Sequence, residues 1–358
     1  KHPRVTPIQQ TVLDQGLLSS GFNCILQMPT GSGKTWLAEH AIAQTLSQGQ
    51  RAIYLTPLRA LADELCSRWQ RRFAPSPVGV FTGDYSSSQY PVSFQDARLL
   101  VMTPEKLDAC TRHWRSHWGW LPNVDLIVVD EFHLLGDPNR GPRLEGALLR
   151  MMRLNPFIHI LGLSATLGNR VELTDWLKGI DYASDQRPIP LQWSTVRYKR
   201  ADDKPHLLLR ELQRNLAQGG KSLVFVQSRR RAETLATQLQ EAGLQAAHHH
   251  AGLDHKSRHQ VESAFRAGQL EVLIATATLE MGLNLPVRQV VLYDLQGFDG
   301  QDFVPLPVNS VWQRAGRAGR PGLDEVGEVV LIAPVWGQTD HYPKGEFESL
   351  TSGLSQPA

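Results

Sequence analysis

Short apolar runs alternate with longer amphipathic stretches through the first half of the chain. Four runs rich in leucine, isoleucine and valine lie at residues 52–55, 99–102, 126–129 and 158–161. Runs of this length and composition are typical of strands buried on both faces of a parallel sheet. Helical character follows at residues 36–46, 58–72 and 145–153. The alternation predicts a doubly wound α/β domain.

The same pattern returns in the second half, after a stretch rich in proline and mixed charge at residues 180–205. Further apolar runs lie at residues 223–226, 272–275, 290–293 and 329–332. We therefore expect two α/β domains, each a mostly parallel sheet with helices on both faces. The expected boundaries are 1–190 for the first domain, 191–205 for a linker, 206–336 for the second domain and 337–358 for a poorly ordered tail.

Composition supports an ordinary globular protein with two cores. The chain has 358 residues, 41% of them hydrophobic, and its formal net charge of +2 neither demands nor excludes nucleic acid. We find no apolar run of membrane-spanning length and no signal peptide. Three cysteines are too few for a cluster held by four cysteines. They lie far apart, with neither a metal spacing nor an even-numbered disulfide set, which indicates a reducing, cytoplasmic location. The start at Lys1 suggests a fragment or a processed form.

Residues 28–35, Met-Pro-Thr-Gly-Ser-Gly-Lys-Thr, follow a short apolar run and precede a helical stretch. A glycine loop between a strand and a helix directs backbone N–H groups at phosphate. Met28 stands where such loops usually begin with glycine. We expect Lys34 to reach the β- and γ-phosphates and Thr35 to hold Mg²⁺. The nucleotide-binding candidates are therefore Thr30, Gly31, Ser32, Gly33, Lys34 and Thr35, with ATP and Mg²⁺ as cofactors.

The sequence Asp130-Glu131-Phe132-His133 comes directly after the run at 126–129. Ligands of such sheets bind beyond the carboxyl ends of the strands. Asp130 suits Mg²⁺ coordination through water, and Glu131 suits orientation or deprotonation of the attacking water. The alternative is an acidic pair favoured only by a helix dipole.

A third group of candidates lies in residues 313–320, Gln-Arg-Ala-Gly-Arg-Ala-Gly-Arg. Arg317 and Arg320 are three residues apart and would share one face of a helix. Their guanidinium groups suit the charge that develops on a γ-phosphate, and with Gln313 they are catalytic candidates. A solvated basic helix is the alternative, although two glycines would weaken it. If both halves act on one ATP, it lies in a cleft between domains that opens and closes with hydrolysis.

In its order of motifs the chain resembles superfamily-two helicases of the DExH type, from about Pro7 to Pro334. The resemblance implies two tandem RecA-like domains, adenine contact by Gln9, and ribose contact through Gly282 and Asn284. It also implies that Ser164, Thr166 and His133 couple hydrolysis to strand movement. The implied nucleic-acid contacts are Pro57, Arg59, Thr82, Gly83, Thr103, Pro104, Gln227, Ser228, Arg229, His250, Gly252 and Thr278.

The residue sequences of several motifs, such as PLRALADE and TLEMGLNLP, resemble those of the Ski-like branch and, within it, archaeal-type repair helicases. This implies ATP-driven 3′-to-5′ movement of a monomer on single strands, with Phe298 and Phe303 on a hairpin that separates the duplex. The match covers the core domains only, so accessory proteins or further C-terminal domains are expected to support unwinding. The residues after His133, Gly136-Asp137-Pro138 and Arg140-Gly141-Pro142, resemble those of the repair-type helicases, which favours DNA over RNA as the partner.

Several alternatives remain at this level. The chain could strip proteins from strands without unwinding, act on RNA, or serve as an ATP-controlled scaffold with little turnover. The run His248-His249-His250 invites a metal site, but consecutive strand residues point to opposite faces, so a site using all three is not expected.

Overall fold

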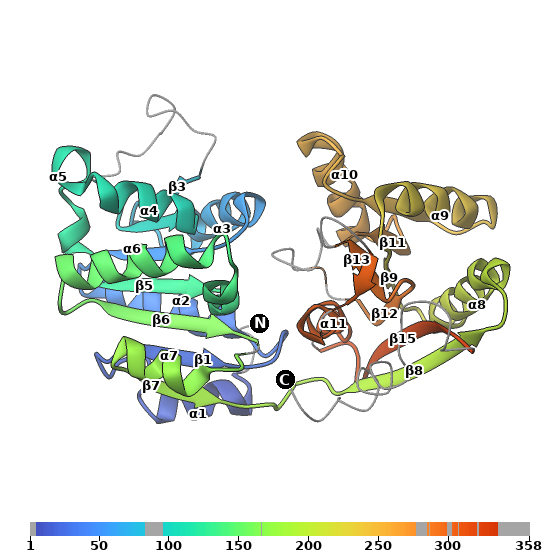
Figure 1. Cartoon of the computed structure of the whole chain (residues 1–358), viewed down its shortest axis with the longest axis horizontal. Helices are drawn as coiled ribbons and strands as arrows, with labels where there is room; N and C mark the ends of the chain where they lie inside the picture. Colours follow the sequence, from blue (N-terminus) through green and yellow to red (C-terminus); the bar gives the residue numbers. More distant parts are fainter. Residues whose placement is uncertain are drawn as a thin grey trace. The chain divides into compact units, whose positions relative to one another are not determined.

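The computed structural model describes residues 5–82, 96–165, 167–276, 285, 287–298, 303–306, 308–320 and 322–335. The chain forms two compact units, Lys1–Arg187 and Pro188–Ala358. Each unit is an α/β domain built on a parallel sheet, as expected from the alternation (Figure 1).

The sheet of the first unit has seven strands in the order β3-β4-β2-β5-β6-β1-β7, all paired in parallel. The strands are β1 Cys24–Gln27, β2 Ala52–Leu55, β3 Val78–Phe81, β4 Leu99–Met102, β5 Leu126–Asp130, β6 His159–Ser164 and β7 Ile180–Ala183. The helices are α1 Pro7–Asp14, α2 Lys34–Ser47, α3 Arg59–Arg72, α4 Pro104–Arg112, α5 Trp114–His117, η1 Leu121–Asn123, η2 Phe132–Gly136, α6 Gly141–Leu154 and α7 Arg170–Leu177.

Two apolar layers hold this sheet. Side chains of α1, α2 and α3 pack with one face, and those of α4, α6 and α7 pack with the other. The central strands β2 and β4 are buried along their whole length. Both faces are therefore covered, and the exposed part of the sheet that can meet a ligand is its carboxyl edge.

The sheet of the second unit has six parallel strands in the order β10-β11-β9-β12-β15-β8. The strands are β8 Leu191–Tyr198, β9 Ser222–Phe225, β10 Ala246–His249, β11 Val272–Ala275, β12 Gln289–Leu292 and β15 Gly327–Pro334. The antiparallel pair β13 Gln296–Phe298 and β14 Phe303–Pro305 forms a separate hairpin. The helices are η3 Ala201–Asp203, α8 Lys204–Leu216, α9 Arg229–Glu241, α10 His255–Arg266 and α11 Val308–Ala315. Residues of α8 and α9 pack on one face, and those of α10 and α11 on the other.

The predicted linker at 191–205 was wrong. Residues 191–198 form β8, which pairs with β15 along eight residues, and α8 begins at Lys204. Prolines 188 and 190 lie before this strand, where they cost no ladder hydrogen bond, so their presence does not mark a flexible segment.

The arginine segment was also predicted wrongly as a helix face. Helix α11 ends at Ala315, so Arg317 and Arg320 lie in the connection beyond it. Gly319 has φ +93°, and a Cβ there would lie 2.7 Å from Ile189 Cγ2. The glycine therefore serves a left-handed turn at a close approach, not a helix.

Candidate active site

The phosphate loop lies between β1 and α2, as predicted. Gly31 and Gly33 have φ values of +84° and +93°, a region that favours glycine. A Cβ at Gly33 would lie 2.0 Å from Nε2 of Gln9, so this position accepts no larger residue without a shift. Gly33 is also the N-cap of α2, whose first amides carry the positive end of the helix dipole.

Lys34 is turned into this loop. Its Nζ donates hydrogen bonds to the carbonyl oxygens of Met28, at 2.7 Å, and Pro29, at 3.3 Å. Burial lowers the pKa of Lys34, and the nearby carboxylates of Glu131 and Asp130 oppose this shift. The ammonium is thus held at the loop and lies close enough to both acidic residues to feel their charge.

Ser32 provides a test of whether the loop suits a phosphate. Its side chain is buried, and within the described part of the chain Oγ makes no hydrogen bond. A buried hydroxyl without a partner costs free energy unless a ligand satisfies it. Phosphate oxygens accept such hydrogen bonds, so the residues present fit a triphosphate.

Gln9 lies beside the same loop. Its Oε1 accepts a hydrogen bond from the Thr6 amide at 2.9 Å, completing a capping box at the start of α1. Its Nε2 lies 3.5 Å from the carbonyl oxygen of Gly33. Helix α1 therefore fixes Gln9 against the loop.

The two acidic residues lie at the carboxyl end of β5, separated from β1 only by β6. The phenol of Tyr54, on β2, donates a hydrogen bond of 2.8 Å to Oδ2 of Asp130. Burial, and next the charge of Glu131, raises the pKa of Asp130 to about 6. A second positive charge at this carboxylate would lower that pKa again, which favours Mg²⁺ there.

Glu131 begins the short helix η2 with a left-handed backbone, φ 55° and ψ 54°. Such a conformation is uncommon for a residue with a side chain and recurs at functional sites. Its Oε2 lies 3.4 Å from Nδ1 of His133 but makes no hydrogen bond within the described residues. The strained backbone therefore holds a carboxylate that retains hydrogen-bonding capacity.

His133 connects this carboxylate with β6. Its Nδ1 lies 3.2 Å from Oγ of Ser164, the last residue of that strand. Burial, and next the charge of Lys34, lowers the pKa of His133, which keeps the imidazole neutral near pH 7. Three of the predicted groups, Glu131, His133 and Ser164, thus form one chain of contacts.

The raised pKa of Asp130 predicts a pH-dependent stability cost. Its folded-state pKa of about 6 lies above the ordinary value of 3.8, so the folded state loses stability as pH rises between these values. We expect Asp130→Asn to stabilise the nucleotide-free protein by about 1–3 kcal/mol at pH 7.5, with the gain vanishing toward pH 4. Urea unfolding of both proteins at the two pH values measures this. A variant less stable than the parent at pH 7.5 would contradict the assignment.

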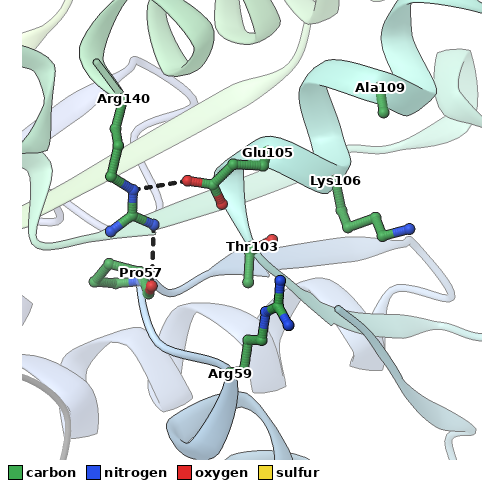
Figure 2. A pocket seen from close by; sticks show the side chains of 7 residues that line it. All are labelled: Pro57, Arg59, Thr103, Glu105, Lys106, Ala109 and Arg140. Carbon is green, nitrogen blue, oxygen red and sulfur yellow. Dashed lines mark hydrogen bonds and ion pairs between the residues drawn. The ribbon is translucent and has the colours of Figure 1, made fainter. Parts of the chain in front are cut away.

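A pocket of the first unit lies over the starts of α3 and α4. It has a volume of about 440 Å³ and is lined by Pro57, Arg59, Thr103, Glu105, Lys106, Ala109 and Arg140 (Figure 2). Arg140 donates to Oε1 of Glu105 at 2.7 Å and to the carbonyl oxygen of Pro57 at 3.0 Å. Three cationic side chains against one carboxylate give the pocket a positive balance that suits phosphate.

The predicted contacts in the second unit surround the start of α9. Ser228 caps this helix, because its Oγ accepts the Arg231 amide at 3.2 Å. The Gln227 amide donates to Oδ2 of the buried Asp294 at 3.0 Å. Asp294 also pairs with Lys204 at 2.8 Å and with Arg231 at 2.7 Å. This network fixes the loop that carries Gln227 and Ser228, leaving the exposed Arg229 at its surface.

Of the catalytic candidates in the second unit, Gln313 lies on α11, and Arg317 and Arg320 follow this helix. Arg320 forms a two-point pair with Asp324: Nε donates to Oδ2 and Nη2 donates to Oδ1, both at 2.8 Å. The hydrogen bonds that Arg320 donates to Asp324 raise the pKa of its guanidinium above the ordinary value. A carboxylate in this position holds the guanidinium in one plane.

Comparison with known families separates the chain into the same two parts. Residues 6–174 match the DEAD/DEAH box helicase family, and residues 203–322 match the helicase conserved C-terminal domain. The chain carries a DEAD/DEAH box helicase domain followed by a helicase C-terminal domain. The family resemblance drawn from the motifs is confirmed, and so are two helicase core domains with parallel sheets.

Similar proteins are archaeal helicases named ATP-dependent DNA helicase Hel308. Those of Methanocella arvoryzae and Pyrococcus abyssi are each 35% identical to this chain, over 99% and 98% of it respectively. That of Pyrobaculum calidifontis is 34% identical over 98% of the chain. The chain covers 55%, 54% and 56% of these relatives, so it spans about half their length.

Several predicted helicase residues lie outside the described part of the chain. These are Gly83, Thr166, Thr278, Gly282 and Asn284, and also the tail at 337–358. The backbones of Phe298 and Phe303 are paired across the β13–β14 hairpin, but their side chains are not described. Thr82 is buried at the end of β3, and Pro104 begins α4 beside Thr103.

Sequence reasoning missed three residues of this helicase site. Tyr54 lies inside an apolar run and had the signature of core packing, so only the structure shows its bond to Asp130. Lys106 closely follows the predicted contacts Thr103 and Pro104, and Arg140 lies in the segment after His133. A search for cations near the predicted strand-contacting loops would have found both. Among the described helices, none has both the length and the apolar character of a membrane span.

Proposed function

We propose that this chain is the ATP-hydrolysing core of a helicase that moves 3′ to 5′ along single-stranded DNA. The observation that carries this proposal is the grouping of Lys34, Asp130 and Glu131 at the carboxyl edge of one sheet, on strands separated only by β6. Lys34 lies at the loop that follows β1, and the two acids end and follow β5. A phosphate-binding lysine beside two carboxylates is the arrangement that nucleoside triphosphate hydrolysis requires.

Each candidate residue at the phosphate loop and the strand ends of the first unit has a role in this proposal. Thr30, Gly31, Ser32 and Gly33 bind the phosphates, Lys34 draws charge from the β- and γ-phosphates, and Gln9 contacts the adenine. Thr35 and Asp130 would hold Mg²⁺, which neutralises developing charge on the phosphates. Glu131 orients the attacking water and accepts its proton. Contacts from His133 to Ser164, together with Thr166, transmit hydrolysis to the strand-binding loops.

In the second unit, Arg317 and Arg320 stabilise the negative charge that develops as the γ-phosphate is transferred. Gln313 lies near them in the sequence. Gly282 and Asn284 contact the ribose. Planar guanidinium groups suit the oxygens of a transferring phosphoryl group. The proposal for these residues rests on their motifs in the sequence and on the match of residues 203–322 to the helicase conserved C-terminal domain.

The strand-binding surface is proposed along the cationic pocket of Figure 2 and the loops at α9 and β10. Contacts to the sugar–phosphate backbone carry no sequence information, as a translocase requires. The single-strand contacts are Pro57, Arg59, Thr82, Gly83, Thr103, Pro104, Gln227, Ser228, Arg229, His250, Gly252 and Thr278. Phe298 and Phe303 act in strand separation. DNA is proposed as the partner because the archaeal relatives are named as DNA helicases.

The proposal is tested by the polymer that activates hydrolysis. We expect single-stranded DNA to raise the steady-state ATP turnover more than RNA of equal sequence and length. Because backbone contacts release counterions, the DNA concentration for half-maximal activation should rise steeply with salt. Equal activation by RNA would contradict the preference for DNA, and no activation by either polymer would contradict the proposed function.

A cytoplasmic location is proposed from the cysteines. Cys24, Cys66 and Cys110 are buried free thiols, and burial raises the pKa of each. Thiols of this kind suit a reducing compartment.

A further inference from the structure

The three consecutive histidines at the end of β10 do not share one environment. His248 and His249 are the last residues of the strand, and His250 directly follows it. His249 points to one face of the sheet, where its Nε2 lies 2.9 Å from Oε1 of the buried Glu262. His248 and His250 lie on the other face, with their rings stacked at 5.2 Å between centroids and 9° between planes. The alternation along a strand that separates His249 from its neighbours also brings those neighbours together.

A carboxylate completes this pair from a different element. Glu233, in the second turn of α9, places Oε1 2.9 Å from Nε2 of His250. One potential ligand atom from each of Glu233, His248 and His250 lies within 4.8 Å of the others. No other group of three such side chains with this spacing occurs within the described residues.

The hydrogen bonding of His250 indicates an unfilled position. Its side chain is only 5% exposed, yet Nε2 makes no hydrogen bond among the described residues, even with the carboxylate oxygen 2.9 Å away. Buried ring nitrogens are ordinarily satisfied by a donor, an acceptor or a metal. A nitrogen without a well-directed partner, facing a carboxylate and a second imidazole, is a group that a cation would satisfy.

We infer that Glu233, His248 and His250 form a binding site for a divalent transition metal, with Zn²⁺ as the ion that suits it best. Two imidazoles and one carboxylate are zinc ligands, and three protein ligands leave a fourth position for water or an anion. Tetrahedral bonds of about 2.0–2.2 Å place ligand atoms roughly 3.4 Å apart. The three ligand atoms lie within 4.8 Å of one another, and Nε2 of His250 is already 2.9 Å from Oε1 of Glu233, so small side-chain shifts bring them to this spacing. Glu233, whose side chain is 52% exposed, has the freedom to move.

Two features of the surroundings set limits on the affinity. The Gly252 amide donates to Nδ1 of His250 at 3.2 Å. A metal ion at Nε2 leaves the ring proton on Nδ1. Nδ1 can then no longer accept a hydrogen bond, so the bond from the Gly252 amide is lost. Arg229 also lies near, because its Nη1 is 3.3 Å from a Cβ built at Gly252. A guanidinium beside the ion weakens binding but favours an anion at the open fourth position.

Competition from thiolates does not complicate the assignment in the second unit. All three cysteines of the sequence belong to the first unit and are buried. Soft metals at the second unit therefore depend on imidazole and carboxylate ligands.

Titration calorimetry of the full chain with Zn²⁺ alone, without nucleotide or nucleic acid, tests the site. We expect one equivalent to bind, and His248→Phe and Glu233→Gln each to weaken it by roughly tenfold or more. His206→Phe and Glu241→Gln replace exposed residues of the same unit and should bind as the parent does. Co²⁺ added to the parent should give visible bands of four- or five-coordination that both site variants lose.

Each result bears directly on the inference. Because the two site residues lie on different elements, failure of one variant to fold leaves the other as the test. Binding unchanged by both substitutions, or no stoichiometric binding by the parent, would overturn the site. A parent that binds Zn²⁺ but does not hydrolyse ATP would leave the metal site standing while contradicting the proposed function.

Discussion

Replacing Arg320 with alanine is expected to lower the DNA-stimulated rate of ATP hydrolysis by about 10³-fold or more. This corresponds to roughly 4 kcal/mol of lost transition-state stabilisation. ATP affinity should change little, because the guanidinium acts mainly on the charge that develops as the γ-phosphate leaves. Rapid-quench hydrolysis together with equilibrium binding of a fluorescent nucleotide measures both quantities on one protein.

The pairing of Arg320 with Asp324 raises a competing explanation, in which Arg320 has a structural role only. The same pair also provides the control. If Arg320 serves only as a local clamp, removing either partner of the 2.8 Å pair should have the same effect. We expect Asp324→Asn to reduce hydrolysis by less than about tenfold, since the cation stays and only its orientation is loosened. Arg210→Ala, which removes an exposed arginine of α8, should match the parent. Equal losses in the Arg320 and Asp324 variants would assign Arg320 a structural role only.

Replacing Glu131 with glutamine is expected to slow hydrolysis by about 10²–10⁴-fold while ATP remains bound. Glutamine keeps the size and the hydrogen-bonding reach of the side chain but cannot accept a proton from water. The backbone strain at φ 55° is unchanged by this substitution, so folding should be preserved. Single-turnover kinetics separate the chemical step from binding.

A matched control for this variant is Glu145→Gln, on the exposed face of α6 in the same unit. It removes one carboxylate from the unit without touching the strand ends, and hydrolysis should stay at the parental rate. If Glu131 acted only through a favourable helix dipole, Glu131→Gln would cost stability of about 0.3–1 kcal/mol and leave turnover near that of the control.

The central strands were predictable because a strand that is buried on both faces consists almost entirely of apolar residues. Strands such as β2, β4 and β12 are covered on both faces and therefore appear as uninterrupted apolar runs. Three strands that no apolar run predicted, β3, β7 and β8, all lie at edges of the two sheets. Edge strands are half exposed, so β7 and β8 alternate partly buried and exposed residues and the run signal disappears.

The site was predictable to the level of motifs but not of partners. Lys34, Asp130 and Glu131 were found because glycine loops and acidic strand ends carry a local signature. The bond between Tyr54 and Asp130 joins residues 76 positions apart, and no local pattern reports such a contact. The metal cluster shows the opposite error: alternation along β10 argued correctly against three histidines, yet two of them and a distant glutamate come together.

The most direct test of the account is displacement of streptavidin from a biotinylated single-stranded DNA by the full chain. A motor that moves 3′ to 5′ should accelerate release from a 5′-biotin end when ATP is present, and leave a 3′-biotin end at the spontaneous rate. Glu131→Gln supplies the control without turnover. Release that is no faster with ATP than without it at either end, from a protein that binds the strand, would contradict the claim that this chain converts ATP hydrolysis into movement along DNA.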